Sequence, residues 1–501
     1  MIGPAPAGCS PAGRPADAVA FPHAFPPRRR RTIKHYDVVI IGTGPAGQKG
    51  AIQAAKMGKS VAIVEKQNVL GGAQINTGTI PSKSLREAAL HLTGAAQRGN
   101  YSGASRGKKE ITIHDLIEIS STVIRHEWEV IRGQFERNGV DLLWGSAHFE
   151  GPNLLMIQGD GDSQMVTADR FLVCCGTRPA KPESVPFDDD AVFTSDGLLK
   201  LQRLPKSMIV VGGGVIGTEY ASIMATLGVK VTLVEGRPHL LGFLDSEISG
   251  AFMYFMRQQG VTLRMGEKVA NIERVEHRNG TVTSLVQATL ESGKKLKAET
   301  LLYAVGRQGV CGALGLENVG ISFDDRERLK VDEHYATNVE HVYAAGDVIG
   351  FPALASTSME QGRRAIAHAF GQDVGNYNTD LFPYGIYAVP EISMVGKTEE
   401  QLTSEGIPYE AGVARYEEIA RGQILGDRTG MLKMLIHQDS HKILGVHCMG
   451  TGATELVHIG QCVMGLDGTA EFFINNVFNF PTLAEAYKVA AYNGLNKLAH
   501  V

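Results

Sequence analysis

Two short runs of apolar residues, each followed directly by closely spaced glycines, stand out in the pattern of hydrophobic and polar positions along the chain. The first run, residues 36–41, leads into Gly42, Gly44 and Gly47, and alanine-rich helical sequence follows. A short apolar run of this kind, interrupted here only by Asp37, is typical of a strand buried on both faces of a sheet. The pattern therefore predicts a strand, a glycine turn and a helix, followed by a second apolar strand that ends at Glu65.

Such a unit can bind the diphosphate of a dinucleotide. The first glycine allows the tight turn, the second lets the backbone approach the diphosphate, and the third lets the helix pack closely on the strand. The phosphates then lie at the N-terminus of the helix. A carboxylate at the end of the next strand accepts hydrogen bonds from the adenosine ribose. We therefore predict a dinucleotide site formed by Gly42, Gly44, Gly47 and Glu65.

The same pattern recurs in residues 208–235. An apolar strand leads into Gly212, Gly214 and Gly217, and the strand after the next helix ends at Glu235. Two such sites in one chain indicate electron transfer between two nucleotides. We expect one to be a tightly but non-covalently held FAD and the other an exchangeable nicotinamide dinucleotide.

The end of the second site bears on the choice between NAD and NADP. Glu235 favours NAD, because a carboxylate accepts a hydrogen bond from a free ribose 2′-hydroxyl and repels a 2′-phosphate. Arg237 follows two residues later. It either offsets part of that repulsion or is a solvated surface arginine, and the sequence leaves both possibilities open.

Charge and composition exclude several classes of protein. The 501 residues carry 49 basic and 53 acidic side chains, a balance that does not suit a dedicated nucleic-acid binder. Apolar runs stay well below the roughly 18 residues of a membrane span, so we expect a soluble, cytoplasmic protein without membrane association. Residues 1–34 contain six basic residues and one acidic residue among many prolines, alanines and glycines, which predicts a disordered extension. It is either a targeting segment or, more simply, a dispensable tail.

Six cysteines in so long a chain are too few for a disulfide scaffold. Cys174 and Cys175 are neighbours in a predicted strand, residues 171–175, where adjacent side chains point to opposite faces; we do not expect a redox pair there. The 16 histidines show no ligand spacing, so no metal site is predicted.

The segment between the two glycine turns carries a more specific resemblance. Residues 71–83 read GGAQINTGTIPSK, residues 304–307 AVGR, residues 342–347 VYAAGD and residues 481–485 PTLAE. With the two glycine turns, these segments resemble the FAD-dependent pyridine nucleotide-disulfide oxidoreductases, the superfamily of dihydrolipoamide dehydrogenase and glutathione reductase. The resemblance covers residues 35–501.

It implies an α/β fold with two Rossmann-like dinucleotide-binding domains, for FAD and NAD(P), and a C-terminal α+β dimerisation domain. The FAD-binding domain is expected in residues 35–185 and 306–375, the NAD(P)-binding domain in residues 186–305, and the dimerisation domain in residues 376–501. A homodimer follows from the same resemblance.

The resemblance also implies roles for individual residues. Asp347 matches an acid that contacts the ribitol and diphosphate region of FAD, and Gly306 belongs to a cofactor-binding segment. Lys83 and Glu219 match a buried ion pair beside the flavin ring, where the lysine stabilises the negative charge of the reduced flavin.

Two departures from the superfamily bear on function. Its disulfide reductases place two cysteines, spaced C-x4-C, where this chain has Gln74 and Thr79, and a histidine where it has Phe480. The thiolate attacks the substrate disulfide and the histidine moves its protons. Both parts of the thiol chemistry are replaced, although the acidic partner of the histidine is kept as Glu485. The acceptor is therefore expected to be a second nicotinamide.

One branch of the superfamily fits this expectation. Residues 78–83, 242–245, 346–352 and 478–487 are similar to the soluble, Si-specific pyridine nucleotide transhydrogenases. We predict FAD-dependent hydride transfer between NADPH and NAD, in ping-pong fashion through the reduced flavin, with Thr79 against the ring and no dithiol relay. The alternatives are a diaphorase with a quinone or other small acceptor, a dihydrolipoamide dehydrogenase-like protein that has lost its thiol chemistry, and a non-catalytic flavoprotein.

Overall fold

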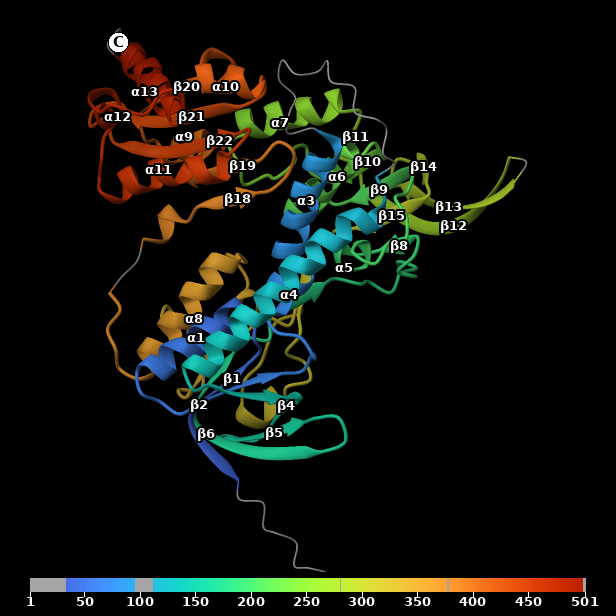
Figure 1. Cartoon of the computed structure of the whole chain (residues 1–501), viewed down its shortest axis with the longest axis vertical. Coiled ribbons are helices and arrows are strands. Elements are labelled where there is room, and N and C mark those ends of the chain that lie inside the picture. Colours follow the sequence, from blue (N-terminus) through green and yellow to red (C-terminus); the bar gives the residue numbers. More distant parts are fainter. Residues whose placement is uncertain (1–32, 95–110, 280, 376–377, 499–501) are drawn as a thin grey trace, which may run out of the picture.

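The chain is represented by a computed structural model that describes residues 33–94, 111–279, 281–375 and 378–498 (Figure 1). All of the predicted N-terminal extension except Ile33 and Lys34 lies outside the described residues. The first strand begins at Lys34.

The first glycine turn belongs to a seven-stranded sheet in the lower half of Figure 1. Its strands are β1 (Lys34–Ile41), β2 (Val61–Glu65), β3 (Asp141–Trp144), β4 (Ser146–Gly151), β5 (Leu154–Gln158), β6 (Ser163–Val173) and β17 (Val342–Ala344). The order is β3-β2-β1-β6-β5-β4, with β17 parallel to β6. Its helices are α1 (Pro45–Lys56), α2 (Gly72–Asn76), α3 (Thr79–Thr93), α4 (Ile113–Arg137) and α8 (Ala355–Ala369).

The burial of β1 explains why its sequence is apolar at consecutive positions. Val38 and Ile40 pack with α1, α4 and α8 on one face of the sheet. Val39 and Ile41 pack on the other face with β4, β5 and the 3-10 helix Leu316–Val319. A central strand covered on both faces has no solvent side on which polar residues would be favoured.

The second glycine turn belongs to a five-stranded parallel sheet, seen at the upper right of Figure 1. Its strands are β8 (Val192–Phe193), β9 (Ser207–Val211), β10 (Lys230–Glu235), β11 (Thr262–Met265) and β15 (Thr300–Tyr303), and its helices are α5 (Ser195–Leu198), α6 (Val215–Thr226) and α7 (Ser246–Gln258). The order is β11-β10-β9-β15-β8. An antiparallel sheet of β12 (Val269–Asn279), β13 (Thr281–Leu290) and β14 (Lys295–Ala298) adjoins it, and β7 (Thr177–Pro179) pairs with β16 (Arg307–Gly309) where the chain passes between the two units.

A third unit, at the upper left of Figure 1, is built on an antiparallel five-stranded sheet. Its strands, in the order β18-β19-β22-β21-β20, are β18 (Tyr384–Ile386), β19 (Ile392–Gly396), β20 (Tyr409–Arg415), β21 (Met431–His437) and β22 (Ile443–Met449). Its helices are α9 (Glu399–Glu405), α10 (Ala420–Leu425), α11 (Ala453–Gly465), α12 (Glu471–Asn475) and α13 (Glu485–Leu498). The remaining short 3-10 helices are Asp347–Ile349, Thr379–Leu381 and Tyr416–Glu418.

One predicted strand ends earlier than expected. Strand β6 stops at Val173, so Cys174 and Cys175 follow the strand and do not lie within it. The two cysteines lead into a turn in which residue 176 has a positive φ of 70°, a backbone conformation that favours glycine.

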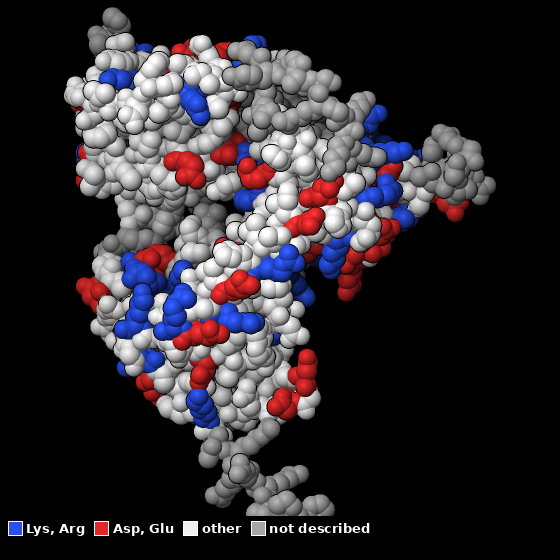
Figure 2. Space-filling model, viewed as in Figure 1, with Lys and Arg blue, Asp and Glu red and all other residues white. Residues whose placement is uncertain are grey.

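The charge distribution on the surface and the character of the helices concern the nucleic-acid-binding and membrane-spanning classes of protein. Basic and acidic side chains are interspersed on the face drawn in Figure 2. None of the helices in the described ranges combines the length and the apolar character needed to cross a bilayer.

Candidate functional site

A cavity of about 1250 Å³ lies where the two glycine turns and helix α3 meet. It is lined from the first unit by the carboxyl end of β1, by the N-termini of α1 and α3 and by Asp347, and from the second unit by the N-terminus of α6. Ligand cavities commonly measure about 300 to 1,000 Å³, so this one has room for a large cofactor.

The first glycine turn has the geometry of a diphosphate site. Gly42 has a φ of 106°, and a Cβ atom there would lie 2.4 Å from the carbonyl oxygen of Cys174. A Cβ atom on Gly47 would lie 1.9 Å from the carbonyl oxygen of Gly42. Gly44 differs, since a Cβ atom there would meet nothing within 4 Å and would point into space beside the cavity. That open approach to the backbone suits a phosphate at the N-terminus of α1.

Glu65 lies at the end of β2, as predicted, and lines the same cavity. One carboxylate oxygen accepts hydrogen bonds from the backbone N–H and the hydroxyl of Thr43, and the other from the backbone N–H of Gln67 at 2.8 Å. These hydrogen bonds hold the Glu65 side chain rigidly beside the first glycine turn.

Asp347 begins a 3-10 helix, and the side chains of Thr177 and Arg307 hold its carboxylate in place. Its carboxylate accepts a hydrogen bond from the Thr177 hydroxyl at 3.1 Å and lies 3.9 Å from Nε of Arg307. Arg307 in turn donates to the same hydroxyl at 2.7 Å. Asp347 and Gly306 both line the cavity, together with Gly42, Gly44 and Glu65, whereas Gly47 lies behind the turn and does not line it.

Lys83 and Glu219 form the predicted ion pair. Nζ of Lys83 lies 2.9 Å from each carboxylate oxygen of Glu219, although the two residues are 136 positions apart. The Glu219 side chain is only 4% exposed and also accepts a hydrogen bond from the backbone N–H of Tyr387 at 2.8 Å. The ammonium group sits 4.8 Å from the centre of the Tyr387 ring. Three separate units thus hold one cation at the wall of the cavity.

Three polar atoms of residues in the cavity wall indicate that its ligand is polar. Oε1 of Gln74, the Tyr220 hydroxyl and Oγ of Ser358 are buried and have no hydrogen-bond partner within the described part of the chain. Buried polar atoms are rarely left unpaired in native proteins. Together with the open backbone at Gly44, these atoms fit FAD, which carries both a diphosphate and a ring with hydrogen-bonding edges.

Thr79 is the first residue of α3 and also lines the cavity, one helical turn before Lys83. Cys174 and Cys175 line it as well, at the end of β6 beside Gly42. Both thiols are free, and burial raises the pKa of Cys175 to about 12 and that of Cys174 well above its usual value. A thiol that stays protonated is a poor nucleophile.

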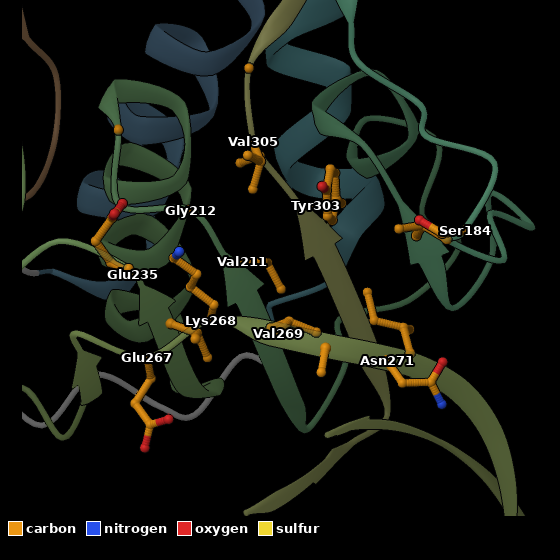
Figure 3. A pocket seen from close by; sticks show the side chains of 18 of the residues that line it. Ser184, Val211, Gly212, Glu235, Glu267, Lys268, Val269, Asn271, Tyr303 and Val305 are labelled. Atoms are coloured by element: carbon orange, nitrogen blue, oxygen red, sulfur yellow. The ribbon is translucent and has the colours of Figure 1, made fainter. Parts of the chain in front are cut away.

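A second cavity, of about 630 Å³, lies at the carboxyl ends of β9, β10 and β15 (Figure 3). Gly212 and Gly217 repeat the close contacts of the first turn, and a Cβ atom on Gly214 would again meet nothing within 4 Å. Gly214 and Gly306 line both cavities. A dinucleotide that begins in the second cavity can therefore extend past Gly214 toward Lys83.

Glu235 and Arg237 interact directly at the outer end of this second cavity. Nε of Arg237 lies 3.0 Å from one carboxylate oxygen of Glu235 and Nη2 lies 3.0 Å from the other. The backbone N–H groups of Gly213 and Arg237 also donate to Glu235. Burial opposes ionisation, but these hydrogen bonds outweigh it and lower the pKa of Glu235. Arg237 is therefore paired with Glu235, although its side chain is still 54% exposed.

Phe480 and Glu485 lie away from both cavities within the single chain. Neither residue lines the two cavities. Phe480 is 72% exposed on the segment before α13, whereas Oε2 of Glu485 is buried without a hydrogen-bond partner in the described residues.

Comparison with known proteins identifies the family of the chain. The profile described as pyridine nucleotide-disulphide oxidoreductase matches residues 36–362, and that of the family's dimerisation domain matches residues 382–491. The chain belongs to the pyridine nucleotide-disulphide oxidoreductase family. Membership confirms the predicted fold class, and it implies an oxidoreductase that uses FAD and a nicotinamide dinucleotide.

Two relatives within this family match over nearly their whole length. The soluble pyridine nucleotide transhydrogenase of Mycobacterium tuberculosis is 51% identical over 468 residues, which cover 93% of this chain and 98% of the relative. The protein of the same name from Klebsiella pneumoniae is 43% identical over 467 residues, 92% of this chain and 98% of the relative. The resemblance to this branch, first indicated by residues 78–83 and 242–245, is confirmed.

Solved structures agree with this family fold. LpdA from Mycobacterium tuberculosis superposes with a TM-score of 0.83 at 25% identity, covering 92% of this chain and 99% of that one. The HOCl-induced flavoprotein disulfide reductase RclA from Escherichia coli gives a TM-score of 0.80 at 27% identity, covering 91% and 99%.

Several residues at the site were not predicted. Tyr387 and Ser358 carry no local motif, and their place at the cavity depends on how the three units pack. Thr43 could have been inferred, since it sits between the first two glycines and its hydroxyl can reach the acid at the end of the next strand.

Proposed function

We propose that this protein is an NAD(P) transhydrogenase of the soluble, Si-specific type, which transfers hydride between NADPH and NAD in ping-pong fashion. The two relatives that carry this name support it. The observation that carries the proposal is a shared wall: α6 begins at the second glycine turn and, one turn later, supplies Glu219 to the ion pair with Lys83. The proposed nicotinamide site and the proposed flavin site thus share a wall at the start of α6.

The residues that would hold FAD are Gly42, Gly44, Gly47, Glu65 and Asp347, and we propose that they bind it tightly without a covalent bond. FAD bound there supplies a group that can accept a hydride and give it back. Lys83, fixed by Glu219, places a positive charge where reduction adds negative charge. Thr79 would pack against the flavin ring and, unlike the cysteine that it replaces, carries no thiol.

NADPH and NAD would occupy the second site in turn. Gly212, Gly214 and Gly217 hold the diphosphate, and Glu235 with Arg237 holds the adenosine ribose. Gln74 and Thr79 offer an amide and a hydroxyl where a disulfide substrate would need thiols, so the electrons leave by the route through which they entered. We further propose a homodimer, in accord with the dimerisation domain.

The half-reactions test this function. Anaerobic NADPH is expected to bleach the flavin absorbance of the purified protein without a long-wavelength thiolate band. Addition of NAD, or of its thio-analogue, is then expected to restore the absorbance. Failure of NAD to restore it, together with fast recovery on adding a quinone, would contradict the transhydrogenase and favour a diaphorase.

Neutralising Glu235 is expected to change nucleotide preference. In Glu235→Gln the acceptor for a 2′-hydroxyl is weakened and Arg237 is released toward a 2′-phosphate, so the ratio of kcat/KM for NADPH to that for NADH should rise about tenfold. Glu267→Gln is the matched control, since Glu267 lines the same cavity but bonds to Ser292 and Lys294. An unchanged ratio in Glu235→Gln would remove this residue from the account of selectivity.

A further inference from the structure

One lysine in the second cavity has no ionic partner. Lys268 lies directly before β12 and lines the cavity near Glu235 and Arg237. Among the residues that the structure describes, no carboxylate forms an ion pair with it. Figure 3 shows its side chain extending into the cavity toward the end of β10, where Glu235 lies.

The backbone and the stem of Lys268 are held in place. Its carbonyl oxygen accepts a hydrogen bond from the backbone N–H of Glu291 at 2.9 Å. Its aliphatic stem lies over Gly236, where a Cβ atom would come within 3.2 Å of Cγ of Lys268. Glycine at position 236 therefore lets the lysine lie close to the strand end that meets the adenosine ribose.

The charges around Lys268 leave its own charge uncompensated. Arg237 neutralises Glu235 by a two-point contact. Glu267 accepts hydrogen bonds from Ser292 and Lys294, and Figure 3 shows its carboxylate pointing away from Lys268. With both nearby carboxylates already paired, the ribose end of the cavity carries the net positive charge of Lys268.

We propose that Lys268 binds the 2′-phosphate of NADP(H) and thereby allows a site with an acidic ribose residue to accept both nucleotides. NAD would use Glu235, whose pairing with Arg237 is exposed enough to yield to a ribose hydroxyl. NADP(H) would leave that pair closed and place its extra phosphate against the ammonium group. The inference rests on the proposed function in taking both nucleotides as substrates.

Binding of nucleotide fragments to the FAD-loaded protein tests this proposal. The probes are adenosine 2′,5′-bisphosphate and 5′-AMP, which differ only in the 2′-phosphate. Lys268→Met is expected to weaken the bisphosphate about tenfold, as for the loss of one charge-assisted hydrogen bond, and to change 5′-AMP by less than about twofold. The tenfold loss should shrink at high salt, because the site is solvent-accessible.

Lys230→Met is the matched control. Lys230 is an exposed lysine at the opposite end of the same strand, β10, and does not line the cavity. Its variant should bind both probes as the wild type does. Equal affinities of Lys268→Met and wild type for the bisphosphate would overturn the proposal, and so would an equal loss for both probes. A failure of the proposed function would instead appear in the half-reactions, without any change in these affinities.

Discussion

Replacement of Lys83 by methionine is expected to slow reduction of the flavin by NADPH by about a hundredfold and to shift its redox midpoint to a more negative potential. The ammonium group is held 2.9 Å from both oxygens of Glu219 at the wall of the cavity. A charge fixed in advance at the position where opposite charge develops typically contributes a factor of about 10² to 10³. Stopped-flow absorbance and an anaerobic redox titration measure the two quantities.

The structure supplies a control for the loss of a lysine as such. Lys59 lies 4.7 Å from the centre of the Phe370 ring, a contact much like that of Lys83 with Tyr387, but it does not line the cavity. Lys59→Met should keep the wild-type midpoint and rate. Lys83→Met also leaves Glu219 without its cation, so the double variant with Glu219→Gln should still show the shifted midpoint. A wild-type midpoint in both Lys83 variants would remove the electrostatic role.

The parts of the site that follow local rules could be predicted from the sequence. Gly42 and Gly47 follow from backbone sterics at the turn, and Glu65 from the end of an apolar strand that is buried on both faces; each lies where the pattern placed it. The ion pair of Lys83 with Glu219 could be predicted only through resemblance, because 136 positions separate the partners. The pairing of Arg237 with Glu235 could not be read from the sequence, because the spacing of the two residues does not fix where the arginine side chain points.

The physical role of residues 242–245 could not be predicted from the sequence. Its sequence indicated the transhydrogenase branch but no physical role. In the structure Asp245 caps α7 by accepting from the backbone N–H of Glu247, and the same side chain reaches the third unit. No local pattern connects Asp245 with Lys433, 188 positions away.

Lys433 on β21 joins the second unit to the third through a buried cluster of charges. Its side chain is 1% exposed, and Nζ lies 2.8 Å from Asp245, 2.9 Å from Glu247 and 2.9 Å from Glu399. Burial alone would lower the pKa of Lys433, but the three carboxylates raise it above its usual value. Burial likewise opposes ionisation of Asp245, yet Lys433 keeps the pKa of that carboxyl below its usual value. Lys433 and Asp245 are therefore both charged at neutral pH.

Lys433→Met is expected to destabilise the protein by about 3 to 5 kcal/mol, because it leaves Asp245 buried without a cation. Urea unfolding at fixed protein and FAD concentrations measures this loss. Lys442→Met is the matched control, since Lys442 lies in the same unit but pairs with Asp467 on the surface, where such pairs contribute about 1 kcal/mol or less. A loss in Lys433→Met no larger than that in the control would contradict the cluster's contribution.

The pH dependence of the same variant separates charge from packing. In the wild type the folded pKa of Asp245 is lowered, so its contribution is complete above the unfolded value of about 3.9 and is lost as the pH falls through the folded pKa. Without Lys433 the burial of Asp245 should raise that pKa above the unfolded value. The variant then regains stability as Asp245 takes up a proton, and its deficit should be smaller near pH 5 than near pH 8. Adding Asp245→Asn should recover part of the deficit at the higher pH, whereas a cavity left by the lysine stem would cost the same at both.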